Sequence, residues 1–484
     1  MKTSKPTTAD AFKLLMEGSR VLTRMEHHGI AIDEKYLAET SAKVSRRIKK
    51  LTEKLKRDEI WFAWRKRYAD KALLTSDAQL TEILFTVLKH PYPKGDEWRT
   101  ATGRYRADEE MIGRINLPFT KSWKKLKKLN RLQGTYLSGI KREVVNGRVH
   151  PGFNLHTVET YRSSASDPNI QNQYNRDPEM KDLLRRCFVS SPGCCLVEVD
   201  FSTIEVRVSC ALHKDPTLVK YMKDPTTDMH RDTAAELYML PVDYLIEHRD
   251  WAKKNVRDWA KNRFVFPQFY GSVFFQCAPN LWKPVADSTL PDGTSLLEHL
   301  KSKGIRKLGK KDSNWNSGRI VTPSNTFMEH VRNVERSFWE ERFPVYTAWK
   351  RKTYDAYLER GYVDTLTGFR LSGLYRRNEI LNGDIQGSSF HCLLWSLIQI
   401  QKELTRRKLK AELVAEVHDS LLADVPVGEV DEFLDLCHEV MTERLPRTWK
   451  WLNVPMETES EVCVKNWAEK VVYVRHENGK WGPK

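Results

Sequence analysis

The chain has 484 residues, of which 40% are hydrophobic and 30% are charged, and its formal net charge is +16. Its length allows about three domain-sized units. No apolar run approaches the roughly 18 residues of a membrane-spanning helix, and the start lacks a signal-peptide core. The sequence therefore predicts a cytoplasmic protein with no membrane contact. Eight cysteines without a CxxC pair are expected to be reduced, and the basic charge favours a polyanionic partner.

Residues 1–146 are expected to be mostly helical and to include two long basic amphipathic helices. Between Ser45 and Arg57, seven Lys or Arg residues alternate with apolar residues at helical spacing. Between Lys121 and Arg142 there are eight basic residues and no acidic one. Two such helices suggest a support that tracks a phosphate backbone. Either helix alone could equally present an ordinary solvated charged face.

Strand-like sequence follows over residues 147–212, where one β-rich run ends at Val199-Asp200-Phe201. A second run, far later in the chain, leads to Val417-His418-Asp419-Ser420, and its pattern is typical of a hairpin with Asp419 near the turn. If the two strands are neighbours, their carboxylates meet. Close carboxylates repel each other unless cations lie between them, and a pair of Mg²⁺ ions is the usual reason for such a site. Two unrelated strand-end aspartates are the alternative interpretation.

Residues 213–365 are expected to be helical again, with a loop-rich insertion over the polar stretch 279–325. Arg257 and Lys261 are four residues apart and so share one helix face. Aromatic residues follow at Phe264, Phe266, Phe269 and Tyr270. A cationic face followed by aromatics can hold a triphosphate at one end and stack a base at the other. Surface charges above an aromatic core stripe are the alternative. From residue 366 onwards, strand and helix alternate.

Taken in order, these segments resemble the family A DNA polymerases, the bacterial DNA polymerase I type with its phage members. Three segments are similar to the catalytic motifs of that family: Asp200 to Arg207, Arg257 to Gly271 and Val417 to Asp419. Further matches agree in order and spacing: Met25 to Asp33, Gln79-Leu80, Thr160 to Asn172, Asp228 to His230, Thr365 to Gly368, Asn382 to Gly387 and Asn466-Trp467. The resemblance covers the chain from about residue 10 to residue 468.

The resemblance implies an α+β fold with the shape of a right hand. A helical thumb would occupy residues 1–146. An antiparallel palm sheet would combine residues 147–212 with residues 366–484, and helical fingers would occupy residues 213–365. The last segment, Val471 to Lys484, receives no role from the resemblance.

The implied activity is template-directed addition of dNTPs to the 3′ end of a primer by two-metal phosphoryl transfer. Asp200 and Asp419 would bind two Mg²⁺ ions, and Glu205 and Lys261 would complete the catalytic set. Glu205 would crowd the 2′ position of the sugar, so that ribonucleotides fit poorly. The implied nucleotide contacts are Arg257, Lys261, His230, Phe266, Tyr270 and Glu205. The implied contacts to primer-template DNA are Arg162, Asn172, Asn382, Gln386 and His418.

Three departures from the family pattern affect these expectations. Lys261 and Tyr270 are one position further apart than the family usually shows, and Pro267 stands where glycine is common. A proline there should kink or bulge the helix. The helix register therefore stays open between Lys261 and Asn262, with Lys261 preferred for its charge. Ser420 replaces the usual glutamate, which weakens the third motif but spares the metal ligand. Phe266 in place of tyrosine implies poor use of dideoxynucleotides.

Because the thumb-like pattern begins near Met1, the protein is expected to lack proofreading and 5′-nuclease domains. The hypothesis follows that it replicates a phage or mobile-element genome in the host cytoplasm, with a separately encoded exonuclease or other replisome proteins as partners. Two alternatives stay open: a phage-type RNA polymerase, which shares the palm, and an inactive polymerase-derived scaffold that binds nucleic acid. Glu205 argues against the first, and the intact Asp200 and Asp419 argue against the second.

Overall fold

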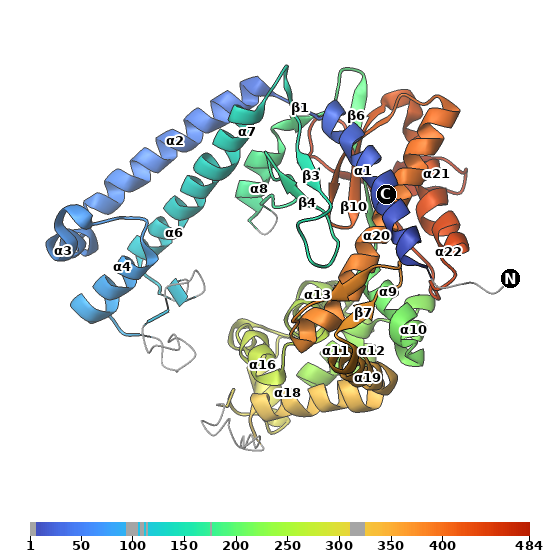
Figure 1. Ribbon diagram of the computed structural model, residues 1–484. Coiled ribbons are helices and arrows are strands. Elements are labelled where there is room, and N and C mark those ends of the chain that lie inside the picture. Colours follow the sequence, from blue (N-terminus) through green and yellow to red (C-terminus); the bar gives the residue numbers. More distant parts are fainter. Residues whose placement is uncertain (1–5, 93–104, 107–110, 113–114, 175–176, 310–324) are drawn as a thin grey trace.

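The computed structural model describes residues 6–92, 105–106, 111–112, 115–174, 177–309 and 325–484. Its central part is built around a sheet, from which a long helical arm extends, and a helical lobe lies below (Figure 1). The helical arm is formed by the described residues between 34 and 143, and the lower lobe is formed by the described residues between 204 and 360. The central part combines segments from the beginning, the middle and the end of the chain.

The central sheet has six antiparallel strands in the order β13-β12-β11-β6-β10-β9. Their bounds are β6 (Cys194–Phe201), β9 (Glu412–Val417), β10 (Ser420–Pro426), β11 (Thr458–Cys463), β12 (Val471–Arg475) and β13 (Trp481–Pro483). In β6, Val197 and Val199 are fully buried, and the alternation of a strand directs Glu198 and Asp200 to the opposite face. The antiparallel sheet expected from the sequence is confirmed, with the two aspartate-bearing segments side by side.

Helices from both ends of the chain pack against this sheet. They are α1 (Thr8–His28), α20 (Arg377–Arg407), α21 (Val430–His438), the π-helical turn η10 (Glu439–Arg444) and α22 (Leu445–Thr448). α1 contacts α20 and β9 closely: a Cβ atom at Gly18 would lie 2.7 Å from the Leu394 side chain. The segment 1–146, expected as one helical unit, therefore contributes both to the core around the sheet and to the arm.

Short strands and one helix join the central part to its surroundings. β1 (Ile30–Ile32) lies between β2 (Arg148–Val149) and β5 (Phe188–Val189) in a separate three-stranded sheet. Two small hairpins are formed by β3 (Gly152–Asn154) with β4 (Ser164–Ser166) and by β7 (Tyr362–Asp364) with β8 (Arg370–Ser372). Helix α8 spans Pro178–Arg185.

The helical arm is built from two long helices that lie side by side (Figure 1) and a smaller tip. Its elements are α2 (Glu34–Lys56), α3 (Glu59–Tyr68), η1 (Ala69–Lys71), α4 (Asp77–Thr81), η2 (Glu82–Val87), α6 (Pro118–Arg131), η4 (Leu132–Leu137) and α7 (Ser138–Glu143). Both basic segments expected as helices are helical. In α6, Trp123, Leu126 and Leu129 form a buried stripe, so the lysines occupy the remaining faces.

The lower lobe is helical and has its own aromatic-rich core. Its elements are α9 (Ile204–His213), α10 (Pro216–Lys223), α11 (Met229–Tyr238), α12 (Val242–Glu247), α13 (Arg249–Lys254), α14 (Val256–Ala260), η5 (Lys261–Val265), α15 (Phe266–Phe269), α16 (Phe274–Trp282), η6 (Val285–Asp287), α17 (Leu296–Ser302), α18 (Phe327–Arg336), η8 (Ser337–Arg342) and α19 (Pro344–Arg360). Phe264, Phe338 and Phe343 are fully buried there, with ring centroids of neighbours 4.8–5.5 Å apart.

The described part of the expected loop-rich insertion, residues 279–309 and 325, combines loops with short helices. α16 continues to Trp282, α17 follows, and Leu290, Leu296 and Leu300 are buried in the core of the lower lobe. The segment has few apolar residues, but these leucines pack into the core of the lobe. Because the rest of the segment is polar, its overall composition does not reveal them. Residues 310–324 lie outside the described residues.

The last strands extend the central sheet. Strand β12 pairs with β11, β13 pairs with β12, and Trp481 Nε1 donates a hydrogen bond of 2.9 Å to Asp435 Oδ1 on α21. Just before β12, Lys470 Nζ lies 2.5 Å from Glu198 Oε2 and 2.6 Å from Glu461 Oε2. These three side chains are largely buried, so Lys470 neutralises two carboxylates on the same face as Asp200.

All eight cysteines are free thiols, as expected, and all but Cys194 are buried. Throughout the described ranges, no helix combines the length and the apolar character that crossing a membrane would require.

We predict that Lys470→Met lowers the free energy of unfolding by about 2–4 kcal/mol, because it leaves two buried carboxylates without their cation. The matched control is Lys465→Met, whose side chain is 77% exposed and 3.9 Å from Glu469. That control should change stability by less than about 0.5 kcal/mol. Urea denaturation of both variants measures the difference, and equal losses would contradict the role of Lys470.

Candidate active site

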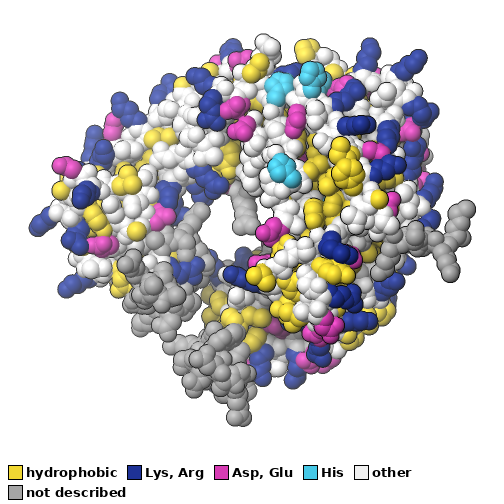
Figure 2. All heavy atoms as spheres, viewed as in Figure 1, with side chains coloured by type: hydrophobic (Ala, Val, Ile, Leu, Met, Phe, Trp, Pro, Cys, Tyr) yellow, Lys and Arg dark blue, Asp and Glu magenta, His cyan; other side chains and the backbone are white. Residues whose placement is uncertain are grey.

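A cavity of about 640 Å³ lies where the end of the central sheet meets the lower lobe. Figure 2 shows the surrounding surface, with a hollow between the arm and the rest of the molecule and basic side chains at several points of its rim. Most of the site residues expected from the sequence line this one cavity: Arg162, Asn172, Glu205, Phe266, Tyr270, Asn382, Gln386, His418 and Asp419. They come from segments that are far apart in the chain.

The two aspartates meet through the register of β6 and β10. Asp200 is paired with Ser420 across the strands, and the backbone N–H of Phe201 donates to the carbonyl of Asp419 at 3.1 Å. Between β9 and β10 the turn consists of His418 and Asp419, with His418 in the left-handed region at φ 63°. The expected hairpin with Asp419 at its turn is confirmed, and both carboxylates lie at one end of the sheet.

Both carboxylates are in surroundings that disfavour negative charge. Burial, followed by the charges of Asp419, Glu198 and Glu459, raises the pKa of Asp200 to about 7. Burial also raises the pKa of Asp419 to about 6, with Arg162 opposing and Glu205 reinforcing the shift. Within the described residues, Asp419 Oδ1 is buried and accepts no hydrogen bond, and Arg162 Nη2 is 3.9 Å away. A cation between the two carboxylates would relieve this repulsion.

These donors fit a magnesium ion. Carboxylate oxygens are the hard ligands that Mg²⁺ prefers, and the orphaned Oδ1 of Asp419 is available as one of them. No group of three or more His, Cys, Asp or Glu side chains in the described part of the chain is arranged to hold a metal by itself. Two carboxylates completed by water and substrate phosphates are the usual way in which proteins bind Mg²⁺ at nucleotide sites.

Ser420 preserves the local geometry where the third motif departs from the family pattern. Its hydroxyl lies 3.2 Å from the carbonyl of Val417 and 3.4 Å from Glu198 Oε1. The serine therefore closes the turn that presents Asp419. Glu198, the carboxylate that Ser420 contacts, is held by Lys470 in an ion pair.

Glu205 connects the sheet side of the cavity to the lower lobe. It lies in the first turn of α9, and its Oε2 accepts a hydrogen bond from the Tyr270 hydroxyl at the end of α15. Its Oε1 is 3.3 Å from Arg162 Nη1. Burial and the neighbouring Glu205 raise the pKa of Tyr270, so the phenol stays protonated and remains a donor.

The helix that carries Lys261 and Phe266 absorbs the extra residue as a π-helical turn. Residues Lys261–Val265 form η5, and the N–H of Phe266 bonds to the carbonyl of Lys261, five residues back. The expected bulge near Pro267 is therefore present. Pro267 lies in the first turn of α15, where its missing N–H is tolerated.

The π-helical turn also decides which polar side chain accompanies Phe266. Lys261 Nζ lies 5.4 Å from the centroid of the Phe266 ring, and the His230 ring lies 5.8 Å from it. Asn262 instead donates to Asp258 Oδ1 at 2.7 Å and lines a separate cavity with Arg263 and Pro267. Lys261, the preferred residue of the two, is thus the one beside Phe266.

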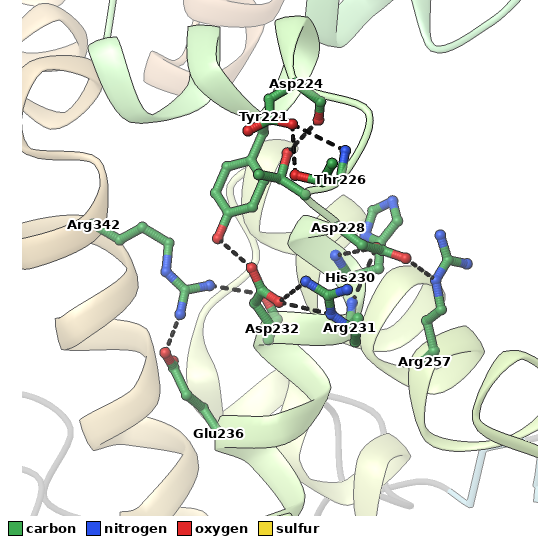
Figure 3. A network of polar contacts seen from close by, with 12 residues as sticks. Tyr221, Asp224, Thr226, Asp228, His230, Arg231, Asp232, Glu236, Arg257 and Arg342 are labelled. Carbon is green, nitrogen blue, oxygen red and sulfur yellow. Dashed lines mark hydrogen bonds and ion pairs between the residues drawn. The ribbon is translucent and has the colours of Figure 1, made fainter. Parts of the chain in front are cut away.

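Arg257 and His230 are joined by Asp228 (Figure 3). Arg257 Nε donates to Asp228 Oδ2 at 2.6 Å, and Asp228 also caps the helix on which His230 lies. Burial, and then the charge of Arg257, lowers the pKa of His230 to about 4, so its imidazole is neutral near pH 7. Arg257 and Lys261 both add positive charge to this part of the site.

Glu416 is a site residue that the sequence analysis missed. It is fully buried in β9, and its Oε1 accepts hydrogen bonds from the hydroxyl of Ser163 and from Gln171 Nε2 (2.6 Å). Its Oε2 has no partner among the described residues, and burial raises its pKa to about 7. Ser163 and Gln171 both line the cavity, so Glu416 orders its wall from behind. The sequence feature that could have identified Glu416 is the presence of a glutamate within an otherwise apolar strand.

Comparisons with known proteins point to one family. The family model for DNA polymerase family A matches residues 34–285 and 331–469. The chain is 27% identical over 455 residues to the thermostable DNA polymerase I of Thermus thermophilus, covering 91% of this chain and 46% of that protein. It is 26% identical over 467 residues to DNA polymerase I of Chloroflexus aurantiacus, with coverage of 93% and 42%. The chain thus spans about half the length of these curated relatives.

A solved structure shares the fold. It is the POL domain of Pol1 from M. smegmatis in complex with DNA primer-template and dNTP, with a TM-score of 0.69 and 23% identity. The similarity covers 94% of this chain and 70% of the other. Three segments stay outside the family match: residues 1–33, which include α1 and β1, residues 286–330, which include α17, and residues 470–484, which form the hairpin of β12 and β13.

We predict that Glu416→Gln stabilises the protein at alkaline pH. The pKa of Glu416 is higher in the folded state (about 7) than in the unfolded chain, so the folded state holds the proton more tightly. The free energy of unfolding should therefore fall as pH rises from about 4.5 to about 7. At pH 8 the variant should be more stable than the wild type by about 1–3 kcal/mol, with a smaller gain at pH 5.

Denaturant unfolding at the two pH values measures this effect. The control is Glu477→Gln, which removes a carboxylate from an exposed position near the C-terminus. It should show no gain that depends on pH. A Glu416→Gln variant that is less stable than the wild type at pH 8 would contradict the argument.

Proposed function

Because the chain belongs to DNA polymerase family A, we propose that it is a DNA-directed DNA polymerase that adds dNTPs to a primer 3′ end. The observation that carries this proposal is the pair of buried carboxylates of Asp200 and Asp419 at one end of the sheet, where Asp419 lines the cavity and its charge raises the pKa of Asp200. We assign the central sheet as the palm, the helical arm as the thumb and the lower lobe as the fingers. The thumb assigned in this way is smaller than the expected range 1–146, because α1 packs with the palm.

Asp200 and Asp419 would hold two Mg²⁺ ions together with phosphate oxygens and water. When bound, the ions supply a lowered pKa for the primer 3′-hydroxyl and neutralise the charge of the triphosphate and of the departing pyrophosphate. The chain itself keeps both aspartates at one end of two paired strands, which fixes their spacing. Arg162 offsets part of the negative charge beside Asp419.

The fingers side of the site would bind the incoming nucleotide; Phe266 and Tyr270 line the cavity, and Arg257, Lys261 and His230 lie outside its lining. Arg257 and Lys261 supply positive charge for the triphosphate, and the neutral His230 offers an uncharged hydrogen-bonding group. Phe266 would lie against the sugar and base, and Tyr270 would lie beside the template base. Glu205 would exclude a 2′-hydroxyl by its bulk, because Tyr270 and Arg162 hold its carboxylate in place.

The palm side would bind the DNA. Arg162, Asn172, Asn382, Gln386 and His418 line the cavity and would contact the terminal base pairs. Minor-groove acceptors look alike in all correctly shaped pairs, so such contacts test geometry rather than sequence. The basic faces of α2 and α6 would follow the phosphate backbone further along the duplex.

The narrower hypotheses stay predictions. They are replication of a phage or mobile-element genome, the absence of proofreading, a separately encoded exonuclease and the poor use of dideoxynucleotides. The relatives named above are bacterial DNA polymerase I proteins, which support the polymerase proposal but not a phage origin.

We predict that Asp419→Asn lowers kcat for primer extension by about a thousandfold or more, because it removes a metal ligand without changing shape. Primer extension with Mg²⁺ on a recessed DNA template measures this, and fluorescence anisotropy should show unweakened primer-template binding. Asp431→Asn, at an exposed position on α21, is the control and should leave extension unchanged. A wild-type protein that binds DNA tightly but does not extend the primer would favour the inactive scaffold.

We predict that Glu205→Ala reduces the preference for dNTPs over rNTPs by about 10- to 100-fold, because it opens the space near the 2′ position. The ratio of kcat/KM values for a dNTP and its matching rNTP measures this. Tyr270→Phe removes one of the two contacts that hold Glu205 and leaves the Arg162 contact and the bulk of Glu205 in place, so it should retain most of the discrimination. A wild-type protein that prefers rNTPs would point to the phage-type RNA polymerase instead.

A further inference from the structure

The carboxylate of Asp228 in the lower lobe accepts hydrogen bonds from two helices, α11 and α14. Asp228 immediately precedes α11, and its Oδ1 accepts the backbone N–H groups of His230 at 3.0 Å and Arg231 at 3.1 Å. Its Oδ2 accepts a hydrogen bond from Arg257 Nε on α14, at 2.6 Å. Asp228 therefore ties the N-terminus of one helix to a cation of the other (Figure 3).

The groups held by Asp228 have unused hydrogen-bonding capacity. Within the described ranges, the two terminal nitrogens of Arg257 make no hydrogen bond, and Figure 3 shows them pointing away from Asp228. His230 Nδ1 is buried and has no partner among the described residues. The Asp228 and Arg257 side chains are 27% and 29% exposed, so the pair is accessible to a ligand but partly shielded from water.

We propose that Asp228 is the positioning residue of the triphosphate subsite. It would hold Arg257 by Nε, so that the terminal nitrogens stay free to contact a phosphate, and would fix His230 at a constant distance from them. This inference rests on the proposed polymerase function and deepens it. An unrestrained arginine has many rotamers, and a nucleotide would have to offset the loss of that rotamer entropy on binding.

Because Asp228 is negatively charged, a positioning role and a purely electrostatic role predict opposite effects of its removal on triphosphate binding. Burial raises the pKa of the Asp228 carboxyl, but the hydrogen bond from Arg257 and further contacts outweigh it, so the pKa is lowered overall. Asp228 therefore stays ionised near pH 7. If the carboxylate only weakened the positive charge of Arg257, its removal would strengthen the binding of a triphosphate. If it positions Arg257, its removal weakens binding. The direction of the change in KM therefore separates the two roles.

The test compares Asp228→Asn and Asp228→Ser. Asparagine and serine are both good N-cap residues, so each variant keeps the cap of α11 while losing the charged contact to Arg257. We expect KM for dNTPs to rise by about tenfold or more, because a charge-assisted hydrogen bond is lost. Changes in kcat, primer-template Kd and Tm should be much smaller. An unchanged or lowered KM would overturn the proposal.

The matched control is Asp224→Asn. Asp224 lies on the same loop and bonds to Thr226, and the structure records no contact between it and Arg257. The Asp224→Asn variant removes a negative charge from the same loop but leaves the contact between Asp228 and Arg257 intact. KM should therefore stay within about twofold of the wild type. A rise equal to that of Asp228→Asn would show a general charge effect and would count against positioning.

A double-mutant cycle with Arg257→Ala tests whether Asp228 acts through this arginine. In the Arg257→Ala background, Asp228→Asn should change KM by less than about threefold, because the positioned group is already absent. A full-sized effect in that background would overturn the proposal.

The inference and the polymerase proposal can fail separately. Equilibrium binding of a fluorescent dATP with Mg²⁺ to the protein with primer-template DNA reports the subsite without requiring extension. A wild type that extends primers while Asp228→Asn and Asp228→Ser retain wild-type KM would reject only the role of Asp228. A wild type that binds the nucleotide but never extends a primer would reject the polymerase function, and weaker binding by the variants would still support the positioning role.

Discussion

The repulsion between Asp200 and Asp419 is the constraint to which the surrounding structure is adapted. The register of β6 and β10 places both at one sheet end, and burial raises the pKa of each. On the same face, Lys470 neutralises Glu198 and Glu461, so that further negative charge near Asp200 is balanced. Lys470 thereby limits the negative charge around the two aspartates, and bound cations would balance the charge of the aspartates themselves.

Besides the packing of α9 against α20, polar contacts near the cavity join the lower lobe to this centre. Tyr270 at the end of α15 reaches Glu205 on α9, which in turn contacts Arg162. Directly before α15, the π-helical turn η5 keeps Lys261 beside Phe266, although this segment is one residue longer than the family usually shows. π-helical turns are frequent at functional sites, and here the turn preserves a face that a continuous α-helix of this length would rotate away.

Outside the family match, the terminal hairpin of β12 and β13 adds two strands to the central sheet. Its start lies next to Lys470, and Trp481 attaches its end to Asp435 on α21. The segment that received no role from the resemblance is thus structural. It covers the edge of β11, and β11 is the strand that directly adjoins Asp200 through Glu459.

The sequence by itself determined the elements whose pattern is local. The alternation leading to Asp200 and the hairpin around Asp419 follow from strand periodicity, and the basic helices follow from helical spacing. Only the tertiary structure placed Lys261 rather than Asn262 beside Phe266, showed Glu416 behind the cavity wall, and brought Asp228 into contact with Arg257. Periodicity indicates which face of an element is buried, but the partner on the other side comes from a distant segment. Which residues meet there depends on packing and backbone hydrogen bonds that no local pattern records.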